Sequence, residues 1–294
     1  MRKLRTKKKK PNLLGKAKKS VSRRFRSGSR RTQQENFILK TPDEIVKLKR
    51  AGHLVAKSFE MLRKEIKPGA VLKDLDRMVE DYITSQGAQS LYKGYRGNPP
   101  NQPPFPSTIC ASINHEICHG FANERVLNDG DIIGIDIGLK LDGYCGDACY
   151  TFAVGNITEE TQNFLKVSEE CLYVGIAAAQ VGNYLGQIGQ AIEDHAHKNG
   201  LSVVERWGGH GIGKNLHEPV SVPHHGPPDY PPILQPGMTF TIEPMINMGT
   251  NECETLADEW TVVTLDGKLS AQYEHTIAIT PSGPEILSKV LPNF

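Results

Sequence analysis

Several features are missing from this chain of 294 residues, and each absence excludes a class of protein. No apolar run approaches the roughly 18 residues that a membrane-spanning helix needs, which argues against an integral membrane protein. The basic N-terminus is followed by no apolar segment, so it is not a secretory signal. Neither a G-x-G-x-x-G nor a P-loop pattern occurs, and no short-period repeat is present.

The cysteines do not form a recognisable metal or disulfide framework. The six cysteines include no CxxC pair, and none lies near the histidine-rich stretch WGGHGIGKNLHEPVSVPHHG of residues 207–226. That stretch is therefore not a zinc finger. A chain of this size does not need disulfides to fold, so we expect all six cysteines to be reduced thiols in a cytoplasmic protein.

Acidic residues are absent from the N-terminal end, where the first one is Glu35. Residues 1–31 hold 15 Lys and Arg, which leaves 20 basic against 33 acidic groups in the rest of the chain. Such a polybasic segment cannot bury enough apolar surface to fold alone. We expect residues 1–40 to form a basic, disordered N-terminal extension and residues 41–294 to form one globular domain.

The secondary structure that the pattern predicts is mixed. Thr41, Pro42 and Glu44 begin a helix with a capping box, and apolar residues then recur at helical spacing to Leu62. Further helices are expected at 72–86, 158–181 and 185–199, and strands at 108–113, 131–141, 144–154, 238–245, 259–265 and 269–280. Asp266-Gly267 indicates a hairpin turn. Helices followed by strands occur twice, which indicates an α+β domain with two similar halves.

Two aspartates come together if the first long pair of strands forms a hairpin. Asp142-Gly143 is typical of a two-residue turn, which would place Gly138 opposite Asp147. Asp136 then lies on the same face as Asp147 and diagonal to it, at roughly 7–8 Å along the backbone. Such a pair either clasps a cation or lies half-exposed on the face of a sheet, and this segment alone leaves both readings open.

Two glutamates favour the metal reading. Glu243 and Glu274 lie within otherwise apolar segments that are predicted to be strands, where a lone carboxylate is costly. Gly138 and Gly146 leave open backbone beside the aspartates, as expected where a ligand approaches closely. Four carboxylates with one or more histidines suit two divalent ions, with manganese, iron, cobalt or zinc more plausible than calcium.

Five segments together resemble the type I methionine aminopeptidases of peptidase family M24, over about residues 41–290. The segments are ICASINHEICHG, IDIGLKLDGYCGD, GGHGIGKNLHEP, TFTIEPM and LSAQYEHTI, in the order and near the spacing of that family. The short interval between His210 and Glu243 leaves no room for the helical insertion of the type II enzymes. The resemblance implies the pita-bread fold, in which pseudo-twofold halves with a curved antiparallel sheet are backed by helices.

The resemblance also implies an activity for residues 41–294. The expected reaction is metal-dependent removal of the initiator methionine from nascent polypeptides, favoured when the second residue is small. A metal-activated water would attack the scissile carbonyl. Two divalent ions (cobalt, manganese, iron or zinc) are expected as cofactors, and the protein is expected to be a cytoplasmic monomer with no membrane association.

The same resemblance assigns residues to roles. The metal ligands would be Asp136, Asp147, His210, Glu243 and Glu274, with Asp147 and Glu274 bridging the ions. Glu243 would also accept a proton from the attacking water, while His217 would stabilise the oxyanion and His119 would contact the scissile amide nitrogen. Substrate would be bound by His119, His217, Tyr92, Phe105, Cys110, Leu216 and Trp260. His224 and His225 are left as loop residues near the cleft entrance without a role.

Some positions depart from the family pattern. Gly138 replaces a Thr that many type I enzymes carry, which removes a hydroxyl close to the metals and changes their support. Leu216 stands where Phe is frequent and makes a looser wall for the methionine pocket. Either Tyr95 or Phe105 suits the aromatic position of that pocket, and we favour Phe105 because of its spacing to Cys110. Ordinary core packing is the alternative role for each pocket residue.

Two alternatives remain for the whole chain, and others remain for its tail. The chain is either another M24-type aminopeptidase or a catalytically weak or inactive pita-bread protein that binds the ribosome or RNA. The basic tail suits binding to ribosomal RNA through phosphate neutralisation. A solvated tail without a partner, or an organellar transit peptide, is the alternative for that segment.

Overall fold

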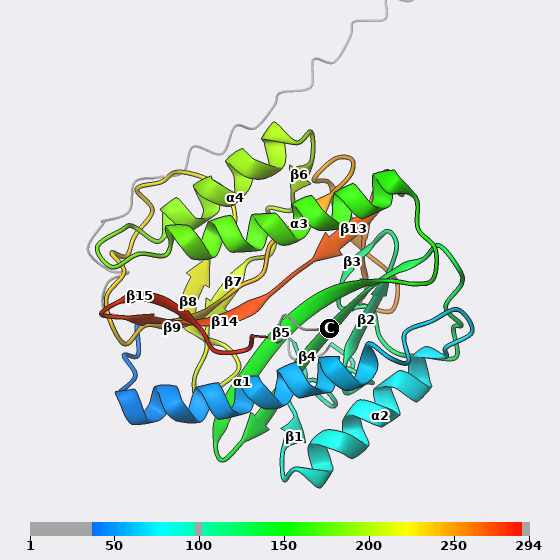
Figure 1. Ribbon diagram of the computed structural model, residues 1–294, viewed down its shortest axis with the longest axis horizontal. Coiled ribbons are helices and arrows are strands. Elements are labelled where there is room, and N and C mark those ends of the chain that lie inside the picture. Colours follow the sequence, from blue (N-terminus) through cyan, green and yellow to red (C-terminus); the bar gives the residue numbers. More distant parts are fainter. Residues whose placement is uncertain (1–36, 98–101, 290–294) are drawn as a thin grey trace, which may run out of the picture. The chain divides into compact units, whose positions relative to one another are not determined.

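A computed structural model describes residues 37–97 and 102–289 of the chain (Figure 1). The predicted N-terminal extension of residues 1–40 therefore lies almost wholly outside the described residues. Within the described ranges, no helix combines the length and the apolar character needed to cross a membrane. All six cysteines are free, as predicted, and five of them are buried.

The predicted helices are confirmed. They are α1 (Pro42–Leu62), α2 (Leu72–Ser85), α3 (Glu159–Ala178) and α4 (Gly186–Lys198). The predicted capping box begins α1: the Thr41 hydroxyl accepts the backbone N–H of Glu44, and the Glu44 carboxylate accepts the backbone N–H of Thr41 at 3.0 Å.

The described strands form antiparallel sheets. They are β1 (Gln89–Ser90), β2 (Cys110–Ile113), β3 (Glu116–Cys118), β4 (Ile132–Leu141), β5 (Tyr144–Ala153), β6 (Ser202–Val203), β7 (Gly209–Gly211), β8 (Glu218–Val222), β9 (Thr239–Ile242), β10 (Met245–Asn247), β11 (Cys253–Thr255), β12 (Val262–Thr264), β13 (Ser270–Gln272), β14 (His275–Thr280) and β15 (Gly283–Ile286). One sheet joins β1, β2 and β5 to β4, and another has the order β15-β14-β9-β7-β8. Two smaller sheets have the orders β13-β10-β6 and β11-β12-β3.

Two hydrophobic cores divide these elements into the predicted halves. In the first half, α1 and α2 pack on β4 and β5; in the second, α3 and α4 pack on β9, β13 and β14 (Figure 1). The halves meet where β5 runs beside β14. There the backbone N–H of Glu274 donates to the carbonyl of Cys149 at 2.8 Å, and the Thr276 hydroxyl donates to the carbonyl of Asp147 at 2.8 Å.

The β4–β5 hairpin has the predicted register. Asp142 and Gly143 adopt φ angles of 49° and 83°, the left-handed conformation that this two-residue turn requires. Gly138 pairs with Asp147, and Asp136 lies two residues away on the same face. The local turn signal thus brings the two aspartates together.

The prediction that Glu243 and Glu274 lie inside strands is wrong. Each lies in a two-residue interruption: Glu243 separates β9 from β10, and Glu274 separates β13 from β14. The interruptions are side by side, since Ile242 pairs with His275 on one side of them and β10 pairs with β13 on the other. Pro244 follows Glu243 and has no N–H to donate, so the ladder cannot continue and the chain passes from one sheet to another.

The hairpin prediction at Asp266-Gly267 is also wrong, although a turn is present there. Gly267 has a φ of 71°, and its N–H donates to the carbonyl of Thr264. The strands on either side do not pair with each other, because β12 pairs with β3 and β11 while β13 pairs with β10. Turn chemistry alone does not choose the strand partners.

The open backbone expected at two glycines is filled by the protein itself. A Cβ atom on Gly146 would lie 2.5 Å from the backbone carbon of Ala51, so α1 packs directly on β5 at this point. A Cβ atom on Gly138 would lie 2.6 Å from Cε1 of Tyr92. Neither glycine leaves room for a ligand, and the prediction of close ligand approach there is wrong.

We expect Gly146→Ala to lower the free energy of unfolding by about 1–3 kcal/mol, because the added methyl group has to push α1 away from β5. Gly134→Ala in the neighbouring strand is the matched control, since its Cβ would meet nothing closer than 3.6 Å. Urea unfolding of both variants measures the difference. Equal stability of the two variants would contradict the close packing of α1.

Candidate metal centre

The residues singled out in the sequence converge on one cavity of about 640 Å³. Its lining includes every predicted ligand and substrate-binding residue: Tyr92, Phe105, Cys110, His119, Asp136, Asp147, His210, Leu216, His217, Glu243, Trp260 and Glu274. They come from both halves of the domain, on strands β2, β4, β5 and β7 and on the segments that join them. The cavity lies at the seam between β5 and β14.

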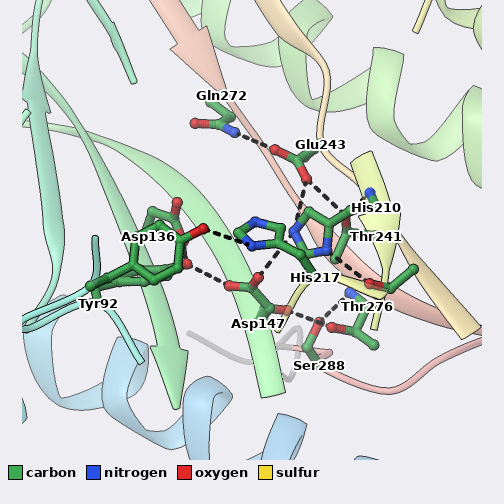
Figure 2. A network of polar contacts seen from close by, with 12 residues as sticks. Tyr92, Asp136, Asp147, His210, His217, Thr241, Glu243, Gln272, Thr276 and Ser288 are labelled. Carbon is green, nitrogen blue, oxygen red and sulfur yellow. Dashed lines mark hydrogen bonds and ion pairs between the residues drawn. The ribbon is translucent and has the colours of Figure 1, made fainter. Parts of the chain in front are cut away.

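Asp136 and Asp147 are joined by a tyrosine (Figure 2). The Tyr92 hydroxyl lies 2.6 Å from Oδ1 of Asp136 and 2.6 Å from Oδ1 of Asp147. The other oxygen of Asp147, Oδ2, faces Nε2 of His210 at 3.6 Å. Asp147 therefore presents its two oxygens to two different sets of side chains.

His210 has one ring nitrogen free to bind a metal. Its Nδ1 lies 3.1 Å from the carbonyl oxygen of Gly211 and donates its proton there, so Nε2 keeps a lone pair. Nε2 faces Oε1 of Glu243 at 3.7 Å as well as Asp147. Burial lowers the pKa of His210 to about 4, which leaves the ring neutral near pH 7.

The two glutamates are held differently. Glu243 accepts two hydrogen bonds, one on Oε1 from the Thr241 hydroxyl at 2.7 Å and one on Oε2 from the Gln272 amide at 3.3 Å. Glu274 has a fully buried Oε1 with no hydrogen-bond partner in the described part of the chain. Glu274, Asp147 and His210 each offer a ligand atom, and these atoms lie within 4.8 Å of one another.

The electrostatics of the cavity favour a bound cation. Burial raises the pKa values of Asp136, Glu243 and Glu274 well above their usual range, and the neighbouring carboxylates raise them further. Burial also raises the pKa of Asp147, to about 6. Oxygen and nitrogen donors around an unpartnered carboxylate oxygen fit a divalent metal ion, which would offset the repulsion between the carboxylates.

The other two predicted histidines, His119 and His217, line the same cavity as these carboxylates. The ring of His217 lies 4.3 Å from that of His210, and its Nδ1 is 3.3 Å from the Tyr95 hydroxyl. His119 has a φ of 57°, an uncommon backbone conformation for a residue other than glycine. Burial lowers the pKa values of both rings to about 4, so both are neutral near pH 7.

An apolar cluster forms another wall of the cavity. Phe105 packs edge-on against Trp260, with ring centroids 5.2 Å apart, and Cys110 and Tyr92 complete the cluster. Tyr95 lies beside Trp260 and also lines the cavity, so Tyr95 and Phe105 are not exclusive choices for its aromatic wall. Leu216 packs in an adjoining buried group beside Tyr92.

Several residues that contact the predicted ligands were not singled out as site residues in the sequence. Thr241 shares the face of Glu243 two residues away, and this spacing was the available signal. Gln272 carried no signal in the sequence. His224 corrects part of an expectation: it lies on the loop after β8, as predicted, but it is fully buried rather than exposed near the cleft entrance, and its Nε2 accepts the backbone N–H of Glu243 at 3.1 Å.

We expect the metal-free protein to lose stability, relative to Asp147→Asn, as the pH rises from about 4 to about 7. The carboxyl of Asp147 has a pKa of 3.8 when unperturbed and about 6 in the fold, so between these values the folded state binds the extra proton. The stability that this extra proton gives the folded state is fully present below pH 3.8 and is lost as the pH rises through 6. The asparagine side chain does not titrate. The lowered pKa values of the buried histidines make stability rise with pH, and this effect is present in both proteins.

Chemical unfolding of both chelated proteins at several pH values measures this difference. A stability difference that stays constant across the range would contradict the raised pKa of Asp147.

Comparison with known proteins agrees with the geometry of the cavity. The profile of Metallopeptidase family M24 matches residues 46–281. The chain is 48% identical over 254 residues to methionine aminopeptidase 1 of Bacillus subtilis, covering 86% of this chain and 100% of that protein, and 44% identical to a methionine aminopeptidase of Clostridium perfringens, covering 86% and 99%. The crystal structure of methionine aminopeptidase from Rickettsia prowazekii superposes with a TM-score of 0.82 at 36% identity, covering 86% of this chain and 100% of that one.

These matches extend over nearly the whole length of the relatives and include the α+β architecture, which is the pita-bread fold. The matches do not favour either alternative for the whole chain, namely another M24-type aminopeptidase or an inactive relative. The chain therefore belongs to metallopeptidase family M24 and, within it, to the methionine aminopeptidases.

Proposed function

We propose that this chain removes the initiator methionine from the N-termini of nascent polypeptides, most readily when the second residue is small. The observation that carries the proposal is one cavity in which four carboxylates, two of them fully buried, and a neutral histidine adjoin an apolar aromatic wall. The carboxylates supply a metal site, and the aromatic wall supplies a pocket for one unbranched apolar side chain.

The proposed centre holds two divalent ions, which would be cobalt, manganese, iron or zinc. The ligands would be Asp136, Asp147, His210, Glu243 and Glu274. A bridging role for Asp147 is supported by its two oxygens, one of which faces Asp136 through Tyr92 while the other faces His210. When bound, such ions lower the pKa of a coordinated water, so that a nucleophile exists at neutral pH.

The protein groups around the ions would divide the remaining work. Glu243 would accept the proton of the attacking water, a role supported by the hydrogen bonds from Thr241 and Gln272 that hold its carboxylate. The Tyr95 hydroxyl lies 3.3 Å from Nδ1 of His217. In the tautomer in which this hydroxyl donates to Nδ1, the ring carries its proton on Nε2 and would donate it to the developing oxyanion. His119, on the same cavity, would contact the scissile amide nitrogen.

The methionine side chain would lie against the aromatic wall. Phe105 and Trp260, which pack edge-to-face against each other, line the cavity together with Tyr92, Cys110 and Leu216. A thioether packs favourably against aromatic rings at about 5 Å, and an unbranched chain fits an irregular apolar space.

We further propose that the protein is a cytoplasmic monomer. What supports the cytoplasm is the thiol content: six cysteines are free, and the packing of five of them in the interior needs no oxidising compartment. The monomeric state follows from the resemblance to the type I enzymes.

We expect Asp136→Ala to abolish the release of methionine from Met-Ala-Ser, because the ions lose a ligand that no neighbouring side chain replaces. Asp81→Ala, an exposed position on α2, is the matched control and should keep full activity. Metal content by mass spectrometry is measured on both proteins. If the wild type binds stoichiometric metal and still releases no methionine, the proposed activity is wrong.

We also propose that the basic tail binds ribosomal RNA, although residues 1–31 lie outside the described residues. Deleting them should leave tripeptide turnover intact and reduce co-sedimentation with ribosomes at low salt, because 15 positive charges that neutralise phosphates are lost. A tail with the same residues in scrambled order is the control and should retain binding. Unchanged co-sedimentation after deletion would exclude this role.

A further inference from the structure

His224 lies directly behind one of the proposed metal ligands. The segment Pro223–His225 follows β8, and the ring of His224 is fully buried. Its Nε2 lies 3.1 Å from the backbone nitrogen of Glu243 and accepts that N–H. The histidine therefore contacts the main chain of Glu243, whose carboxylate faces His210 at 3.7 Å.

The N–H of Glu243 needs an acceptor from outside the sheet. It lies in the interruption between β9 and β10, where the ladder with β14 has already ended at Ile242. Its neighbour Pro244 has no N–H, so His224 satisfies the one backbone donor of this interruption. The partner interruption is held in the same way, since the N–H of Glu274 donates to the carbonyl of Cys149 at 2.8 Å.

The ring of His224 makes this contact at a cost. Accepting on Nε2 puts the proton of the neutral ring on Nδ1, and Nδ1 is buried without a hydrogen-bond partner among the described residues. An apolar side chain would fill the same space without burying that donor.

The backbone that carries His224 is held tightly from two sides. A Cβ atom on Gly189 of α4 would lie 2.7 Å from both the carbonyl oxygen of Pro223 and the nitrogen of His225. A Cβ atom on Gly208 would lie 2.6 Å from the carbonyl oxygen of Val222. Because α4 and the residue before β7 approach this segment so closely, its backbone has little freedom to shift, which limits the movement of the imidazole away from Glu243.

We propose that His224 is a positioning residue of the metal centre, which orients Glu243 toward His210 and Asp147 by holding its main chain. The proposal rests on the ligand role of Glu243 in the proposed function. Glu243 then has three anchors from three segments: Thr241 and Gln272 hold its carboxylate, and His224 holds its backbone. Loss of partners that orient a ligand typically weakens metal affinity by about 10–100-fold.

The test compares variants that keep or remove the acceptor. In His224→Gln the side-chain carbonyl can accept the N–H of Glu243, whereas His224→Leu fills the space without an acceptor. His225→Ala, the neighbouring and only partly buried histidine, is the matched control. Chelated full-length proteins are titrated with Co²⁺ by calorimetry and by visible absorption, and kcat and KM for Met-Ala-Ser are then measured at saturating Co²⁺.

We expect His224→Leu to bind Co²⁺ about 10–100-fold more weakly, with an altered visible spectrum and a lower kcat at little changed KM. His224→Gln should stay within a few-fold of the wild type, and His225→Ala should match it. Where His224→Leu does not fold, His224→Asn takes its place, since its shorter side chain cannot reach the N–H from the position of Nε2. Wild-type Co²⁺ affinity in a folded His224→Leu or His224→Asn protein overturns the proposal, and so does equal loss in the Gln variant.

The outcome is separable from that of the proposed function. A wild type that binds Co²⁺ but releases no methionine contradicts the activity, while the affinities of the His224 variants still decide the positioning role. A wild type that binds no Co²⁺ overturns both.

Discussion

Repulsion among four carboxylates that share one cavity is the constraint on which the rest of this structure depends. Asp136, Asp147, Glu243 and Glu274 line one cavity, and burial and mutual proximity both disfavour their charged forms. Such a group is stable only if it retains protons or binds cations. The unpartnered Oε1 of Glu274 indicates that hydrogen bonds within the protein do not complete the site. A divalent metal ion, which metallopeptidases of family M24 bind, would be that cation.

The fold brings the four acidic side chains together in two different ways. Asp136 and Asp147 lie on adjacent strands of a regular hairpin, where a two-residue turn sets the register. Glu243 and Glu274 lie where two paired chains leave one sheet and enter another, so their backbone groups are freed from the ladder. The hairpin arrangement needs only local sequence. The arrangement of the two glutamates needs hydrogen-bond acceptors from other segments for their backbone N–H groups, which His224 and the carbonyl of Cys149 provide.

The geometry around the two aspartates also explains why residue 138 is a glycine. Tyr92 occupies the space that a side chain at this position would fill, and its hydroxyl contacts both aspartates. The hydroxyl that contacts the aspartates thus comes from a phenol on a segment 44 residues before Asp136. Gly146 serves a different purpose, since it admits the backbone of α1 against β5. Two glycines that look alike in sequence accommodate a side chain in one case and a helix in the other.

By itself, the sequence determined what depends on neighbours a few residues apart. The capping box of α1, the turn at Asp142-Gly143 and the placement of Asp136 and Asp147 on one face of the hairpin were all readable, because capping, turn conformation and alternation are local. Only the tertiary structure decided that the strands stop at the two glutamates, that Asp266-Gly267 joins different sheets, and that His224 is buried behind Glu243. These outcomes depend on which distant segment satisfies a freed backbone group or fills a space, and no local pattern encodes that choice.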